Sequence, residues 1–410
     1  MAKNYSAIYN STNDSSALEQ RFYVKLEASK GQLIAPANAD YIWTLGGGSV
    51  SFNQPFESSP HRSGRHHTDI IKKKKETSWN FSTYFNIDET LGAAASTEVD
   101  TGFRLLMKSL MGFEDVSAGA VYNTSVAPDL TFSLFEVGDK WARQCRGAFV
   151  MSGNMQFPGN GEAMTEWSGN AVEALLIGIG KSTISNNGAN TVTVQTGEGD
   201  FFRVGGLVMI IEANGTTRSA DTAAGSARTI TAISGDVITL SGAVLADADG
   251  SSTPIYLCYY EPAAPTAINN PVTGLVGSMS IVGLPSQCFR SASVNINNEH
   301  ELVDYCYGND ALAAPFFVPG SRVTAEISVE MNLNKDTIAF FNRVQDFDAQ
   351  DLQIILGSAS GRRLVIDAPK VRFPVPAFSV PDTGSIPVTF TGNAYQTALD
   401  AADEVTVSFI

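Results

Sequence analysis

Two segments of this chain, residues 78–85 and 324–333, alternate between polar and largely apolar positions. This period of two predicts β-strands with one buried and one exposed face. The apolar faces contain Trp79, Phe81, Phe85, Ile327, Val329, Met331 and Leu333. The polar faces contain Ser78, Asn80, Ser82, Glu326, Ser328 and Glu330. Strands of this kind are typical of antiparallel sheets that face solvent on one side.

Shorter apolar or alternating runs predict the remaining secondary structure. Further strands are expected at residues 21–27, 49–52, 131–135, 148–156, 163–176, 292–297, 352–356, 363–373 and 386–391. Two other segments, 99–110 and 336–344, have apolar residues at helical spacing. Each predicted helix follows one of the two long alternating strands, so the order of elements occurs twice.

A short motif supports this duplication. Trp167-Ser168-Gly169-Asn170-Ala171 closes the first set of strands, and Phe390-Thr391-Gly392-Asn393-Ala394 closes the second, 223 positions later (169 to 392). Upstream of these motifs, we align Asp129-Leu130-Thr131-Phe132 with Asp351-Leu352-Gln353-Ile354. Matching features in the same order predict a duplicated domain. A domain used twice suits an assembly with nearly equivalent positions better than one catalytic pocket.

A different pattern separates the two copies. Five short apolar runs predict strands at 191–194, 201–211, 229–233, 237–240 and 255–260, and Ser234-Gly235-Asp236 is a hairpin signal. They indicate a small antiparallel barrel or sandwich, followed by a Pro- and Ala-rich linker at 261–272. The predicted organisation is a polar N-terminal arm (1–20), a first copy (21–180), an inserted, outward-facing decoration module (181–262) and a second copy (263–410).

Composition narrows the functional classes. The net charge of −15 argues against tight wrapping of nucleic acid, because that affinity depends on Lys and Arg at phosphates. No apolar run approaches the ~20 residues that span a bilayer, and the polar N-terminus does not resemble a signal peptide. We therefore expect no membrane association and folding in a cytoplasm. The four cysteines have no metal-site spacing, and whether Cys288 pairs with Cys306 stays open.

The most unusual local feature is the basic segment 61–76. Its positive residues are Arg62, Arg65, Lys72, Lys73, Lys74 and Lys75, and it also holds three of the four histidines, His61, His66 and His67. It can be interpreted as a solvated loop or hairpin, as a nucleic-acid contact, as a metal site, or as an arm that docks on the acidic surface of an identical neighbour. Among the functional interpretations, the sequence favours self-association.

Signals for catalysis are weak. The remaining histidine, His300, has no Ser or Cys motif beside it, and Gly46-Gly47-Gly48 lacks the Lys and Ser or Thr of a phosphate loop. A pair of glycosidase carboxylates cannot be recognised from spacing alone. We therefore expect no enzymatic activity, no catalytic residues, no cofactor and no metal.

These residues resemble those of the tail tube proteins of long-tailed bacteriophages. The resemblance lies in RFYVKLEASKGQ (21–32), in KKKKETSWNFSTYFNID (72–88), in the helix that follows and in the closing strand before Gly169-Asn170-Ala171, and the second copy repeats the order. It implies a mainly β fold with two β-sandwich domains, each with a flanking helix, besides the small inserted β-barrel or sandwich module. A duplicated chain implies trimeric rings with pseudo-six-fold symmetry that stack into a tube.

The resemblance also implies roles for residues and partners. The polar faces with Ser78, Asn80, Ser82, Glu326, Ser328 and Glu330 would line the lumen, and the basic arm, present three times per ring, would contact the next ring. Partners would be other copies of the chain, further tail proteins at the tube ends and double-stranded DNA in transient, non-adhesive passage. The location would be the virion tail, assembled in the bacterial host cytoplasm. Another virion β-protein, such as a capsid decoration or baseplate component, and a carbohydrate-binding or hydrolytic β-protein remain alternatives.

Overall fold

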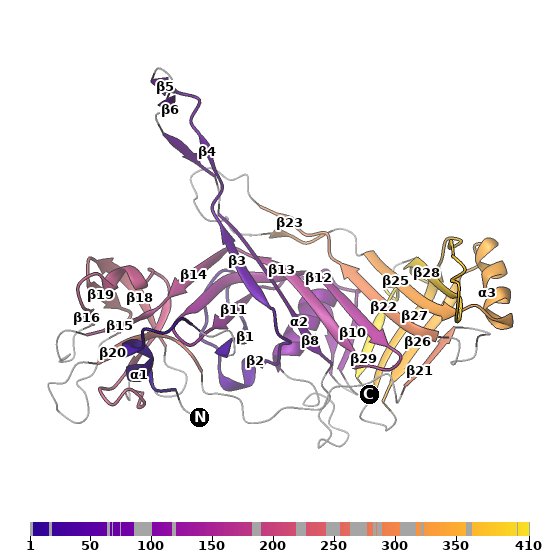
Figure 1. Ribbon diagram of the computed structural model, residues 1–410, viewed down its shortest axis with the longest axis horizontal. Helices are drawn as coiled ribbons and strands as arrows, with labels where there is room; N and C mark the ends of the chain where they lie inside the picture. Colours follow the sequence, from indigo (N-terminus) through magenta and orange to yellow (C-terminus); the bar gives the residue numbers. More distant parts are fainter. Residues whose placement is uncertain are drawn as a thin grey trace.

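The computed structural model confirms that the chain is mainly β. The strands follow one another along an elongated body, with a separate group of strands at one end, helix α3 at the other and a thin hairpin that projects from the middle (Figure 1). The structure describes residues 3–15, 19–63, 66–67, 69–73, 75–85, 101–116, 120–182, 190–218, 227–242, 255–262, 277–281, 284, 289–303, 317–320, 324–357, 363–399 and 401–409.

Two sets of elements correspond to the two copies. The first contains β1 (Arg21–Leu26), β2 (Tyr41–Ile42), β3 (Ser49–Asn53), β8 (Glu76–Tyr84), α2 (Thr101–Met111), β9 (Phe113–Asp115), β10 (Ala120–Asn123), β11 (Phe132–Val137), β12 (Ala142–Pro158), β13 (Met164–Ala171) and β14 (Glu173–Ile177). The second contains β21 (Gly277–Ile281), β22 (Phe289–Asn297), β23 (Glu301–Leu302), β24 (Phe317–Val318), β25 (Thr324–Asn332), α3 (Lys335–Gln345), β26 (Gln350–Leu356), β27 (Leu364–Arg372), β28 (Pro387–Ala394) and β29 (Thr406–Phe409).

One antiparallel sheet runs through both copies. Its strands pair in the order β3-β8-β13-β12 in the first copy and β22-β25-β28 in the second. The two halves are joined because β12 also pairs with β22, from Ser152↔Asn297 to Pro158↔Ser291. We call this sheet the inner sheet, and the pairing of β12 with β22 the internal joint.

The long strand β12 passes from this sheet into a second layer. Its first half pairs with β11 and β14, and its second half pairs with β13 and β22. The bend lies at a bulge beside Gly147, which has a φ of 61° that favours glycine. The buried Glu27 carboxylate accepts hydrogen bonds from the Gly147 N–H (2.8 Å) and from the Thr131 hydroxyl (2.6 Å). These bonds hold the bend in place.

The second copy repeats this arrangement with the same pairing order. Strand β27 pairs with β26 and then, at its end, with β28, as β12 does with β11 and β13. The register shift between Phe132 and Leu134 on β11 recurs between Gln350 and Leu352 on β26. The alignment of Asp129-Leu130 with Asp351-Leu352 is therefore wrong by four positions, because the shared bulge matches Leu134 with Leu352.

The repeated Gly-Asn-Ala motif has the same physical cause in both copies. A Cβ atom on Gly169 would lie 2.1 Å from the carbonyl oxygen of Phe149, and one on Gly392 would lie 2.2 Å from that of Arg372. These are the points where the bent strands β12 and β27 begin to pair with the closing strands β13 and β28. Only glycine permits this close approach.

Both copies share one hydrophobic core. The buried faces of β8, β13, β22, β25 and β28 pack with helix α2 and with the strands of the second layer. The first-copy strand β10 also pairs with β29, and β29 pairs with β27. The two copies follow one another along the chain, but their strands pair with each other and they do not form separate cores.

The inserted segment forms a separate six-stranded sheet among the described residues, in the order β15-β20-β17-β18-β19-β16. Its elements are β15 (Ile179–Lys181), β16 (Thr191–Thr193), the 3-10 helix η3 (Glu198–Phe201), β17 (Leu207–Ile211), β18 (Arg228–Ser234), β19 (Val237–Leu240) and β20 (Tyr256–Tyr259). Its apolar side packs on first-copy residues such as Phe135, Val137 and Ile177. The N-terminal helix α1 (Tyr5–Asn10), which the polar sequence did not predict, packs there as well.

Substitution of Gly392 by alanine tests the duplicated geometry. We expect Gly392→Ala and Gly169→Ala each to lower the free energy of unfolding by about 2–3 kcal/mol, because the added methyl group would overlap a backbone carbonyl. Thermal unfolding followed by circular dichroism measures the effect. Gly46→Ala is the matched control, since a Cβ atom there meets nothing within 4 Å. Equal stability of all three variants would contradict this account of the motif.

Candidate assembly surfaces

The polar residues of the two alternating strands lie on the face of the inner sheet that points away from the core. Ser78, Asn80 and Glu326 are exposed, and Ser82, Ser328 and Glu330 are half-buried. Their neighbours along each strand, such as Trp79 and Ile327, are buried. The structure brings the two predicted groups onto one continuous face, because the internal joint makes β8 and β25 part of the same sheet.

Direct cross-strand pairing builds polar rows across this face. One row runs through six strands in both copies, and it consists of Ser82, Glu166, Asn154, Asn295, Glu326 and Asn393. Within it, the Asn154 amide donates to the Glu166 carboxylate at 3.2 Å. Four of these residues were missed from the sequence, although they occupy the alternate positions of their strands. Their partner strands, which only the fold shows, were needed to place them in the row.

The basic segment forms a two-stranded arm that stands away from the body (Figure 1). It consists of β4 (Phe56–Ser58) paired with β7 (Ile70–Lys72), and β5 (Arg62–Ser63) paired with β6 (His66–His67) towards the tip. Exposed Phe56 and Ile70 lie along the arm.

The structure distributes the predicted arm cations unequally. Lys73 pairs with Glu57 on the arm itself, and Lys75 pairs with Glu173 of β14 at 3.3 Å. Arg62 and Lys72 lie on β5 and β7. Arg65 and Lys74 lie outside the described residues. Lys75 therefore fastens the base of the arm, whereas Arg62 and Lys72 belong to its projecting part.

The segment of the second copy that corresponds to the arm lies between β22 and β25. In its described part, β23 pairs with β24, and the Phe317 ring of β24 stacks on Phe149 of the first copy with centroids 4.2 Å apart. His300 completes this cluster with its ring 4.8 Å from that of Phe317, and its Nδ1 accepts a hydrogen bond from the Gly320 N–H at 3.0 Å. His300 is thus a buried packing residue.

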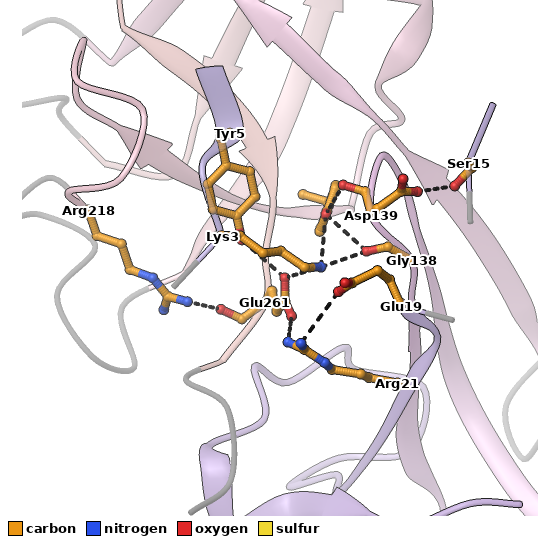
Figure 2. A network of polar contacts seen from close by, with 10 residues as sticks. Lys3, Tyr5, Ser15, Glu19, Arg21, Gly138, Asp139, Arg218 and Glu261 are labelled. Atoms are coloured by element: carbon orange, nitrogen blue, oxygen red, sulfur yellow. Dashed lines mark hydrogen bonds and ion pairs between the residues drawn. The ribbon is translucent and has the colours of Figure 1, made fainter. Parts of the chain in front are cut away.

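A polar network ties the inserted module to the rest of the chain (Figure 2). The Glu261 carboxylate is buried and binds Lys3 at 2.8 Å and Arg21 at 2.7 Å, and it accepts a hydrogen bond from the Tyr5 hydroxyl. Burial, reinforced by the Glu261 charge, raises the pKa of the Tyr5 phenol well above its usual value. Lys3 also donates to the Gly138 carbonyl at 2.7 Å. The network anchors both the N-terminal segment and the residues that directly follow β20, the last strand of the module.

A groove of about 550 Å³ lies between α1, β14 and η3. Its lining includes exposed Leu176 and Phe201, as well as Trp141 and Glu198. The Glu198 carboxylate accepts hydrogen bonds from Tyr9 and from the Lys181 N–H, so it orders the surrounding loops.

Cysteine and metal chemistry give no further site within the described residues. Cys145 and Cys258 are buried free thiols, and Cys288 and Cys306 lie outside the described part of the chain. No group of three His, Cys, Asp or Glu side chains there has a metal-binding arrangement.

No helix in the described ranges has the length and apolarity needed to cross a bilayer. Comparison with models of protein families and with curated proteins found no match.

His300 makes the folded state sensitive to acid. Its burial lowers its pKa from 6.5 to about 4, against the opposing effect of the Asp129 carboxylate. The folded protein therefore favours neutral imidazole, whereas the unfolded chain binds a proton below about pH 6.5. We expect a loss on the order of 2–3 kcal/mol in unfolding free energy between pH 6.5 and 4.

Urea unfolding at several pH values measures this loss. The variant His300→Asn keeps an acceptor near the Gly320 N–H but has no imidazole to protonate, so its stability should fall less steeply over the same interval. The exposed His61 provides the control variant His61→Asn. Identical slopes for the native protein and His300→Asn would show that another group governs the acid sensitivity.

Proposed function

We propose that the chain is the structural subunit of a bacteriophage tail tube, in which three copies form a ring of pseudo-six-fold symmetry and the rings stack. The observation that carries this proposal is the inner sheet, which runs through both copies with one polar face. Each copy would be a tail-tube-like sandwich with its flanking helix. The protein would act in the virion tail, without enzymatic activity or a cofactor, after assembly in the host cytoplasm.

The dimensions of the inner sheet support a DNA-sized channel. Each chain contributes β3, β8, β13, β12, β22, β25 and β28, and residues 373–380, which follow the part of β27 that pairs with β28, would supply an eighth strand in the assembly. Three chains would supply about 24 strands, which gives a barrel roughly 48 Å across at ~4.8 Å spacing and ~40° tilt. Side chains reduce the opening to about 35–40 Å, which exceeds the width of a DNA duplex.

The chemistry of the polar face suits passage of DNA without adhesion. Its rows contain Ser, Asn and Glu, and the exposed Arg290 is paired with Glu330 at 3.0 Å. Carboxylates repel the phosphate backbone, whereas hydroxyl and amide groups remain hydrated. A lumen with this lining would let the genome move at ejection, and Ser78, Asn80, Ser82, Glu326, Ser328 and Glu330 would belong to it.

In this proposal the projecting arm reaches the next ring, three times per ring. An isolated two-stranded hairpin is marginally stable in water, so an arm with exposed Phe56 and Ile70 would be stabilised by a partner surface.

The inserted module would lie on the outside of the tube. It also covers apolar first-copy residues such as Phe135 and Ile177, so loss of tubes after its deletion would report misfolding as well as assembly.

Electron microscopy of the purified full chain tests the tube directly. We expect hollow tubes with three-fold symmetric rings, in which the polar row with Glu166 and Glu326 lines the channel. Discrete rings or capsid-like particles would instead favour another virion β-protein, and monomers under all assembly conditions would favour the carbohydrate-binding alternative. A map with these side chains outside the channel would refute the lumen assignment.

Charge reversal on the arm tests its role between rings. Lys72→Glu combined with Lys73→Glu should shorten tubes severalfold while single rings persist, because the arm would then meet an acidic neighbour with the same sign of charge. Negative-stain microscopy measures tube length. The matched control makes the same charge change on the module with Lys181→Glu and Arg203→Glu. Unchanged tube length in the arm variant, or equal shortening in the control, would count against the arm contact.

A further inference from the structure

The inner sheet ends in two edges that have no partner strand within the described chain. One edge is β3, which pairs with β8. The other lies at β28, which pairs with β25 on one side and with β27 on the other only through Val371 and Arg372. The segment 373–381 follows β27 at this edge and is described without regular secondary structure. Each edge has a counterpart in the other copy of the repeat. These two counterparts pair with each other at the internal joint.

Residue equivalences follow from the pairings. Gly169 and Gly392 match at an offset of 223, and the hairpin from Phe149 to Ala171 has the same length as that from Arg372 to Ala394. Residues 151–157 of β12 therefore correspond to 374–380. Asn80 pairs with Ser49 and with Ser168, and Ser328 pairs with Ser293 and with Thr391, so β3 corresponds to β22.

Apolar residues at the free edges are exposed where their counterparts are buried. Phe378 and Val380 are 46% and 70% exposed, whereas the equivalent Met155 and Phe157 at the internal joint are 0% and 3% exposed. On β3, Phe52 is 45% exposed, and its equivalent, Ile296, is fully buried. A row of exposed apolar side chains along a sheet edge marks a surface that a further strand can cover.

We propose that the β3 edge of one chain pairs antiparallel with residues 374–380 of a second copy, in the register of the internal joint. Asn154↔Asn295 is then reproduced between chains as Ala377↔Ser51, and Met155↔Val294 as Phe378↔Val50. We call this pairing the inter-chain joint. That such joints close into a ring of three copies rests on the proposed function. The inter-chain joint buries Phe52, Phe378 and Val380 together, as Ile296, Met155 and Phe157 are buried within one chain.

Hydrogen-bonding groups on the two edges limit other pairings. At the internal joint, Met151 and Gly159 direct their backbone groups towards β22, so the alternate residues between them do the same. The equivalent outward positions include Pro374 and Pro376, which have no N–H. On β3, the carbonyls of Gly48 and Val50 accept hydrogen bonds from Gln20 and Arg143 side chains. The inter-chain joint therefore depends more on apolar packing, and the edge prolines oppose unspecific strand addition.

Disulfide trapping tests the register. In a background in which Cys288 and Cys306 are replaced by serine, Ser51→Cys with Ala377→Cys should form intermolecular disulfides, since this pair falls within bonding distance only in the proposed register. Non-reducing gels should show a ladder that ends at a covalent trimer. Asn154→Cys with Asn295→Cys is the internal control and should close within one chain. Ser51→Cys with Ser379→Cys is two residues out of register and should remain monomeric.

Several outcomes separate the joint from the proposed function. Rings or tubes in the microscope without a Ser51–Ala377 cross-link, or with equal cross-linking of the shifted pair, would overturn the joint and leave the tube proposal standing. An in-register ladder that continues past the trimer, with no closed rings, would support the joint and contradict the tube. Far-UV circular dichroism of the reduced variants verifies that each is folded.

Loss of the apolar contact is an independent test. Phe52→Ser with Val380→Ser should weaken association at least about tenfold in sedimentation experiments, while the monomer stays folded, because these side chains are already exposed in it. The control, Leu176→Ser with Leu399→Ser, removes two other exposed apolar side chains outside the edges. Equal association of both variants and the native chain would overturn the proposed contact.

Discussion

The pairing of β12 with β22 is the interaction on which the rest of the structure depends. It joins the four strands of the first copy and the three strands of the second copy into one sheet, and it brings Ala292, Val294 and Ile296 into the common core. Because β12 also bends into the second layer at Gly147, one strand determines both the continuity of the sheet and the separation of its layers. The Glu27 carboxylate, directly after β1, supports that bend by accepting hydrogen bonds from the Gly147 N–H, the Thr131 hydroxyl and the Gly31 N–H.

The polar face follows from the same pairing. Since side chains alternate along each strand, a correct register aligns every second residue of neighbouring strands in a row. A shift of one residue at the internal joint would place Met155 where Asn154 now lies and break the row through both copies. The burial of Met155 and Val294 thus enforces the polar character of the opposite face, and the acidity of that face is consistent with a chain of net charge −15.

Much of the secondary structure could be predicted, because alternation at 78–85 and 324–333 and helical spacing near α2 and α3 are strong local signals. The segment 163–176 is two strands, β13 and β14, since the chain changes layers at Val172, and periodicity does not show such a bend. Segment 201–211 likewise begins with η3 before β17. Helix α1 was missed because its main partners lie about 250 residues away, as in the hydrogen bond between Ser6 and Tyr256. The polar residues of β8 and β25 were recognised from the sequence, but those of the neighbouring strands were missed, and the union of all of them into one face required the internal joint.

Duplication also gives the chain two unlike edges. A homodimer with two-fold symmetry would pair like with like, whereas β3 and the segment 373–381 complement each other and not themselves, so association through them is head-to-tail. Head-to-tail contacts produce either closed rings or open filaments, depending on whether the rotation between subunits closes. The internal joint already contains that rotation, because it relates the first copy to the second within one chain. If the inter-chain joint repeats the same register, each contact adds the same turn, and ring size is then determined by sheet twist and by the bulges beside Gly147 and its second-copy counterpart.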